Sequence, residues 1–214
     1  MAGAKPLLGA GLLALAAAAT ALAGSTPPFK PNAADQAAAK ATLLKASDLG
    51  AGWKGGVQVA GRPSAPSCPG FAPREDDLPV TGHALAVFEK PGVDVESDVE
   101  VLQAAAMVRT DFSRTIRPPL AHCLAVTFGQ QSRSGTTIKV LSSTKVAFPA
   151  VAPVTAAYRV TANVTHANQT VKLVVDFVFM GKNRTEITFT VTAAQAMTGF
   201  EQRLARVLAA RARA

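Results

Sequence analysis

The chain has 214 residues, 49% of them hydrophobic, and carries a formal net charge of +8 at pH 7. This length is enough for one domain with a sizeable core. Nucleic-acid binding is not favoured, because the basic residues are scattered along the chain and one Trp and one Tyr leave few rings for base stacking.

The first 23 residues have the layout of a secretory signal peptide. Lys5 precedes an apolar run over 6–23 that ends in Ala21-Leu22-Ala23, a small-x-small cleavage site. A transmembrane anchor is the alternative, but the run is short and rich in Ala and Gly, whereas a span needs about 20 strongly apolar residues. We expect cleavage after Ala23, then a linker over 24–32 and a single domain over 33–214, secreted and without an integral membrane segment.

A first helix is predicted over 33–45. Asn32 and Asp35 form a capping pair ahead of strong helix formers, and Ala37, Ala41 and Leu44 give a thin apolar stripe. Leu49 and Trp53 then anchor the following turn. Trp53 has two interpretations, a core residue or a ring that stacks on a ligand, and we retain it as a ligand-groove candidate.

The two cysteines are expected to form a disulfide bond. Cys68 lies in an irregular Gly-, Pro- and Ser-rich segment, and Cys123 lies in a predicted helix on the same face as Leu120. Two cysteines in an exported chain usually pair, and the closed loop contributes about 4 kcal/mol in the chain-entropy model. The alternatives are a free buried thiol and a reactive or metal-binding cysteine beside His122.

Residues 80–101 predict a β-hairpin that turns at 90–92. Its second strand alternates valines with acids, and the acidic set is Asp94, Glu96, Asp98 and Glu100. This row is expected to be a solvated sheet face, and a cation-binding ladder is the other interpretation. A competing prediction is a helix that starts at Asp98, capped by Ser97 and Glu100.

The rest of the chain predicts two helices, over 103–116 and 119–128, followed by four strands over 136–148, 155–165, 171–180 and 185–192. A closing helix carries the apolar stripe Met197, Phe200, Leu204, Val207 and Leu208. The fold class is therefore α+β, a single domain with a mostly antiparallel sheet of about six strands and helices packed on one face.

Few residues point to a reaction. His83, His122 and His166 have no ligand spacing, and no serine lies in a G-x-S-x-G turn, so we expect no catalytic, metal or cofactor-binding residue. Asp176 is an acid inside the apolar run "KLVVDFVFMG". It is either a buried functional group or, as we favour, a structural partner of a neighbouring Arg159 or Lys172.

Several segments together resemble a family. They are "LLKASDLGAGW", "SCPGF", "SDVEVLQAAAMVRTDF", "LAHCLA", "AFPAV", "LVVDFVFMGKNRTEITFT" and "FEQRLARVLAARA". They are similar to exported proteins and lipoproteins of actinobacteria that resemble the extracellular sensor domains of receptor kinases, with a Mog1/PsbP-like outline. The resemblance implies a helix–sheet sandwich, a Cys68–Cys123 bridge and a non-catalytic sensing role.

Three functions follow as hypotheses. The first is an exported, non-catalytic binding or sensing module for an unknown ligand, such as a small or apolar cell-envelope component. The second is an envelope-associated structural protein held by its positive charge. The third is an exported hydrolase in which His83, His122 or His166 converges with a serine and an acid.

Overall fold

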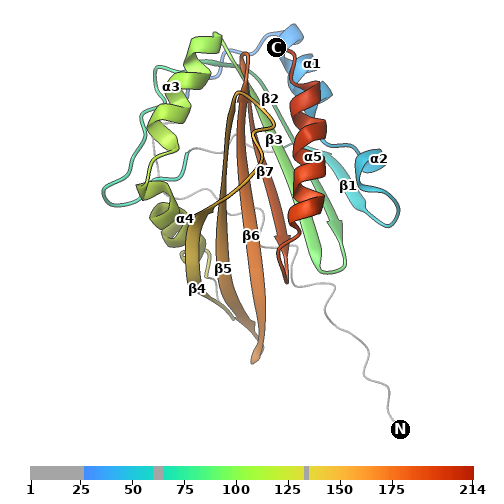
Figure 1. Ribbon diagram of the computed structural model, residues 1–214, viewed down its shortest axis with the longest axis vertical. Coiled ribbons are helices and arrows are strands. Elements are labelled where there is room, and N and C mark those ends of the chain that lie inside the picture. Colours follow the sequence, from blue (N-terminus) through green and yellow to red (C-terminus); the bar gives the residue numbers. More distant parts are fainter. Residues whose placement is uncertain (1–26, 60–64, 133–134) are drawn as a thin grey trace.

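The computed structural model describes residues 27–59, 65–132 and 135–214. The predicted signal peptide lies outside these residues. Seven strands form one antiparallel sheet in the order β1-β2-β3-β7-β6-β5-β4 (Figure 1). Their bounds are β1 (Lys54–Gln58), β2 (Val80–Lys90), β3 (Val93–Leu102), β4 (Thr136–Val146), β5 (Val154–His166), β6 (Gln169–Lys182) and β7 (Thr185–Ala193). The α+β class is confirmed, and the strand that was not predicted is β1, whose sequence KGGVQ has low β-propensity.

The helices pack on both faces of the sheet, not on one face as expected. One face carries α1 (Ala33–Thr42), the short α2 (Ala46–Leu49) and α5 (Thr198–Arg211), whereas α3 (Ala105–Thr115) and α4 (Pro119–Gly129) cover part of the other. In Figure 1, α5 lies in front of the sheet and α4 is drawn behind β4.

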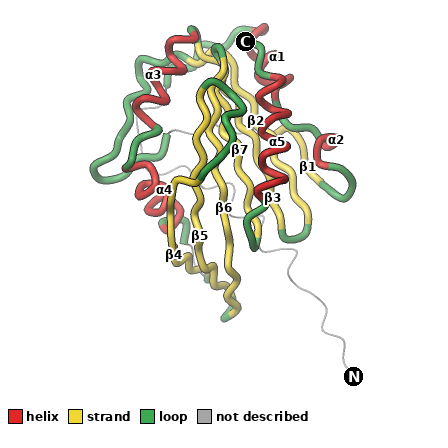
Figure 2. Tube along the Cα trace, in the orientation of Figure 1, coloured by secondary structure: helices red, strands yellow, loops and turns green. Residues whose placement is uncertain are grey.

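Strand β6 explains this two-sided packing. Its residues Val178 and Met180 join the core under α5, and the alternate residues Leu173 and Val175 join the core under α4. Because successive side chains of a strand point to opposite faces, a near-continuous apolar run requires cover on both sides. The loop that follows β4 adds to the α5 side, where Phe148 packs against the core (Figure 2).

The predicted β2–β3 hairpin is confirmed, and the competing helix from Asp98 is wrong because β3 continues to Leu102. The predicted cap of α1 is also present, with the Asp35 backbone N–H donating to Asn32 Oδ1 at 2.9 Å. The stripe predicted for α1 is shifted, since Ala37 is exposed and Ala39 is buried.

Cys68 and Cys123 are bonded to each other, with their Cα atoms 5.5 Å apart. Both lie in the core under α4, together with Phe71 and Leu120. The bridge therefore fastens the long connection between β1 and β2 to α4, and it leaves neither sulfur as a nucleophile or a metal ligand. Within the described residues, no helix has the length and apolarity needed to cross a membrane.

Candidate functional site

Five strands present a graded set of side chains on the face that α3 and α4 cover only in part. In one register row, Val87, Glu96, Thr190, Phe177 and Tyr158 follow one another from β2 to β5. Residues opposite each other in register point to the same side of a sheet. The row therefore runs from acids on β3 through threonines on β7 to aromatic rings on β6 and β5. We call this surface of β2, β3, β7, β6 and β5 the graded face.

The neighbouring rows repeat the pattern. Asp98 lies opposite Thr188, which lies opposite Phe179, and Asp94 lies opposite Thr192. The graded face also collects six of the 14 acidic residues of the chain, namely Glu89, Asp94, Glu96, Asp98, Glu100 and Glu186. A protein with a positive net charge thus concentrates negative charge on one surface.

The acidic row of β3 is not the solvated face that its alternation suggested. Asp98 is 5% exposed, and Asp94, Glu96 and Glu100 are half-buried. Alternation shows which residues share a face, and it does not show whether that face is covered.

This burial changes the acidity of two carboxyl groups. Burial, with a smaller contribution from neighbouring Asp98, raises the pKa of Glu96 to about 7. Burial, with a contribution from Glu89, raises the pKa of Asp94 to about 6. Near neutral pH, small changes in the surroundings therefore shift each carboxyl group between its protonated and its charged form. A cation placed beside them would favour the charged form.

A buried histidine–carboxyl contact lies at one side of the graded face. His83 Nε2 is 3.2 Å from Asp98 Oδ2, and the two side chains are 8% and 6% exposed. His83 comes from β2 and Asp98 from β3, so the pair joins the two strands of the hairpin through side chains as well as backbone.

A second buried group joins β7 to α3. The pKa of Glu186 lies well above its usual range because of burial, then because of the charges of Asp111 and Glu100. Burial also raises the pKa of Asp111, whose Oδ1 accepts a hydrogen bond from Thr115 Oγ1 at 3.1 Å. Burial and the neighbouring acids therefore favour the neutral form of Glu186, which lowers the repulsion between two carboxyl groups in one region.

Aromatic rings form the other side of the graded face. The rings of Phe177 and Phe179 stack with centroids 6.4 Å apart, and Tyr158 meets Phe179 edge-on at 6.1 Å. Phe177 and Phe179 are half-buried, so part of each ring is open. Aromatic faces bind both apolar groups and organic cations.

The two ligand-groove candidates from the sequence, Trp53 and Asp176, lie on the opposite face. Trp53 stacks on Phe200 of α5 with ring centroids 5.8 Å apart. Asp176 is 2% exposed and accepts hydrogen bonds from Arg159 Nε and Nη2 at 2.7 and 2.9 Å. Arg159 is one of the two partners that the sequence suggested, although the pair is more buried than an outward acid would be.

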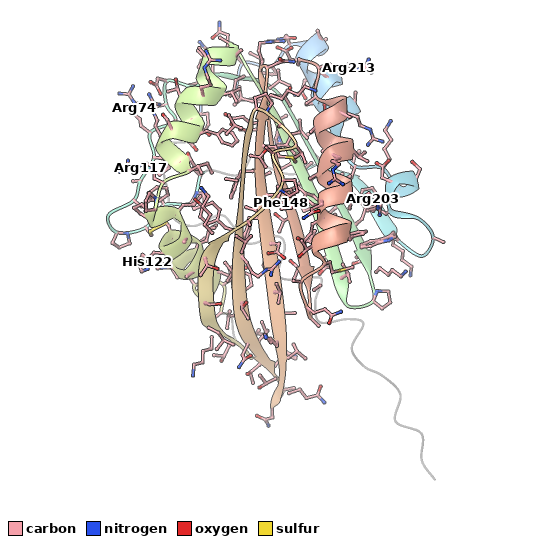
Figure 3. The ribbon with its side chains drawn as sticks, in the orientation of Figure 1. Arg74, Arg117, His122, Phe148, Arg203 and Arg213 are labelled. Carbon is pink, nitrogen blue, oxygen red and sulfur yellow. A yellow bond between two sulfur atoms is a disulfide. The ribbon has the colours of Figure 1, made fainter. Side chains whose placement is uncertain are left out.

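The three histidines do not come together with a serine in the described residues. His83 pairs with Asp98, His166 Nδ1 lies 3.0 Å from Thr136 Oγ1, and His122 is an exposed residue of α4 (Figure 3). The serine hydroxyls that form hydrogen bonds in the described ranges do so with backbone groups, as Ser143 Oγ does with the carbonyl of Ala121 at 2.6 Å. The convergence that the hydrolase hypothesis requires is absent from this part of the chain.

A metal ion also lacks a built site in the residues that the structure describes, since no group of three or more His, Cys, Asp or Glu side chains has the arrangement to hold one. The acids of β3 alternate along an extended strand, where every second residue is about 6.6–6.8 Å apart. Such spacing suits an organic cation that extends along the sheet better than the compact shell of a metal ion.

No protein-family model matches the chain, and the search of curated proteins finds no match. A similar solved structure is the extracellular domain of PknH from Mycobacterium tuberculosis, at 14% sequence identity and a TM-score of 0.47. The alignment covers 85% of this chain and 97% of that one.

Sequence reasoning identified the alternation of β3 and of β7 but did not join the two strands into one site. The signal that could have done so is the matching pattern of acids at 94, 96, 98 and 100 and threonines at 188, 190 and 192. Each pattern alone is typical of an exposed strand.

Proposed function

We propose that this chain is an exported, non-catalytic binding module whose ligand lies against the graded face. The ligand carries a cationic group, which binds at Glu96, and an apolar group, which binds at Phe177 and Phe179. This narrows the expectation of a small or apolar envelope ligand to an amphiphilic organic cation.

The observation that carries the proposal is the register row that joins Glu96, Thr190 and Phe177. Three adjacent strands offer a carboxyl group, a hydroxyl group and an open ring side by side. The carboxyl of Glu96 is held largely away from water with a raised pKa, so a cation placed there gains a charged partner in a region of low dielectric.

Two further parts of the proposal, that the protein is exported and that it binds without catalysing a reaction, are supported by other observations. A disulfide between Cys68 and Cys123 is typical of oxidising compartments such as the cell exterior. The described histidines lack a hydrogen-bonded serine, which is why binding is favoured over hydrolysis.

The test is a thermal-unfolding titration with a matched pair of probes, 2-phenylethylammonium and 2-phenylethanol. The two differ in the cationic group and share the aromatic ring. A ligand that binds the folded state raises Tm by mass action. We expect a clearly larger Tm increase with the ammonium compound, and we expect Glu96→Gln to reduce that increase to the level of the alcohol.

The matched control is Asp76→Asn, which removes one negative charge from an exposed loop. It should respond to both probes as the unaltered protein does. Equal Tm increases with both probes in the unaltered protein, or loss of the difference in Asp76→Asn, would overturn the proposed site.

A further inference from the structure

The outward side of α5 carries only positive charge. Arg203 and Arg206 are exposed, as are Ala210 and Arg213, whereas Leu204 and Leu208 are fully buried. We propose that this side, together with the adjoining surface of α1, α2, β1 and the β2–β3 turn, docks onto an anionic lipid bilayer. We call this surface the basic face.

The outward arginines lower the stability of helix α5 itself. Arg203 and Arg206 are three residues apart, and like charges at this spacing destabilise a helix by about 0.2–0.5 kcal/mol. The acid of the same helix, Glu201, is 2% exposed and points inward. It accepts a hydrogen bond from the Met197 backbone N–H at 2.9 Å, so it does not offset the outward arginines.

Further basic residues surround this stripe. Lys40 of α1 and Lys45 ahead of α2 are exposed, and so is Lys90 at the β2–β3 turn. Lys90 Cε lies 3.5 Å from the position that a Cβ atom on Gly52 would occupy. The Lys90 side chain is therefore beside Gly52, the residue that precedes Trp53. Asp48 is the nearby acid, and Arg211 already neutralises it through two hydrogen bonds of 2.7 Å.

Apolar groups lie among these charges. Trp53 and Phe200 stack with an angle of 5° between their planes, and the guanidinium of Arg203 lies 5.3 Å from the centre of the Phe200 ring. Val57 of β1 is 61% exposed, and it points to the α5 side because it follows Gly55 at a spacing of two, opposite Ala86 of the core.

This combination identifies the partner. A dissolved polyanion would need only the basic residues, whereas the lipid–water boundary also accommodates aromatic and aliphatic groups beside arginines and lysines. Anionic lipid attracts each Lys or Arg near its surface by about 1 kcal/mol. The basic face offers both kinds of group, so we infer a bilayer surface.

The charge distribution sets the orientation on the bilayer. The graded face, with its six acids, belongs to the side of the sheet opposite α5. Figure 3 labels Arg203 and Arg213 on the α5 side of the molecule, away from Arg117 and His122. A bilayer that binds α5 therefore leaves the graded face turned toward solution.

The experiment is flotation with vesicles of phosphatidylcholine containing 30% phosphatidylglycerol, and with pure phosphatidylcholine vesicles. All protein samples must share one N-terminus, verified by intact mass, because the apolar segment over 6–23 could itself insert. We expect binding to the anionic vesicles, little binding to the neutral ones, and at least tenfold weaker binding by Arg203→Glu combined with Arg206→Glu.

The matched control combines Arg109→Glu with Arg117→Glu, which changes the net charge equally at exposed residues outside the basic face. It should bind within about twofold of the unaltered protein, as expected where local charges dominate at a Debye length of about 10 Å. The substitution of Arg203 and Arg206 by lysines should keep binding, because the bilayer recognises charge.

Three results would overturn the proposal. They are equal losses in the two double variants, equal binding to neutral and anionic vesicles, and binding to a soluble polyanion such as polyphosphate without any binding to vesicles. Each result is independent of the thermal response to 2-phenylethylammonium, so the two proposals fail separately.

Discussion

Arg184 and Asp35 form a two-point ion pair across 149 residues of sequence. Arg184 Nη2 donates to Asp35 Oδ1 at 2.6 Å, and Nη1 donates to Oδ2 at 3.1 Å. Thr81 Oγ1 donates to the same carboxylate at 2.6 Å. The pair fastens the first helix to the turn between β6 and β7, and Asp35 is only 6% exposed.

We expect Asp35→Asn to lower the free energy of unfolding by about 2 kcal/mol at pH 7, because charge-assisted hydrogen bonds are lost and Arg184 keeps a weaker partner. The hydrogen bonds from Arg184 hold the pKa of Asp35 well below its usual range. A lowered folded-state pKa stabilises the fold above the unfolded pKa of about 4, and that stability is lost as pH falls further.

Urea unfolding of both proteins between pH 7 and pH 3 measures this difference. The gap between them should narrow below pH 4, where the unaltered protein starts to protonate its unfolded state. A gap that stays constant down to pH 3 would mean that the carboxylate charge contributes nothing.

Glu201 should show the opposite pH dependence. Burial and the charge of Asp176 raise the pKa of Glu201 to about 7. An acid with a raised folded-state pKa binds its proton more tightly in the folded state, so its contribution destabilises the fold progressively as pH rises from about 4.5 to 7. Glu201→Gln should therefore raise the free energy of unfolding at pH 8, by about 1–2 kcal/mol after allowance for partial solvation.

The same variant should have nearly the stability of the unaltered protein at pH 4.5, where Glu201 is protonated in the folded state and only about half ionised in the unfolded state. Thermal unfolding at pH 4.5 and pH 8 checks this, with Asp76→Asn as the matched removal of an exposed charge. A loss of stability at pH 8 would show that the ionised form of Glu201 is the one the fold requires.

Cys68→Ser and Cys123→Ser should destabilise the protein equally. The bridge spans 55 residues, and closing a loop of that size contributes about 4 kcal/mol in the chain-entropy model. Equilibrium denaturation of each variant, of the double variant and of the reduced protein should give one common value. Single variants that differ by well over about 1 kcal/mol would contradict a shared bridge.

Affinity for 2-phenylethylammonium should increase with pH from 5.5 to 8. Glu96, whose pKa is about 7, must lose its proton to pair with a cation, so binding releases a proton below that pH. Isothermal titration in two buffers of different ionisation enthalpy would detect the released proton. An affinity that does not change over this range would remove Glu96 from the site.

Local patterns in the sequence predicted much of the fold. The alternation over 80–101 identified the β2–β3 hairpin, and Asn32 with Asp35 identified the start of α1. These features depend on residues that are close in sequence, where periodicity and capping act directly.

Long-range relationships could not be predicted in the same way. The Asp35–Arg184 pair and the pairing of β3 with β7 each join segments that only the folded chain brings together. The two-sided burial of β6 did have a local signal, the run of apolar residues on both faces around Asp176. This run predicts helices on both faces of the sheet. The apolar stripe of a single helix indicates only that the helix has one buried side, and not which face of the sheet it covers.

The strand order has a consequence for synthesis. The sheet consists of two meanders, β1–β2–β3 and β4–β5–β6–β7, and the seam between β3 and β7 is the only pairing that joins them in the described sheet. During synthesis, which starts at the N-terminus, one edge of β3 stays unpaired until residues 185–193 have been made. Open edges invite pairing between molecules, and charged side chains oppose it. Strand β3 carries the acids Asp94, Glu96, Asp98 and Glu100. The acids that form part of the proposed binding surface in the folded protein should therefore also oppose aggregation of incompletely synthesised chains.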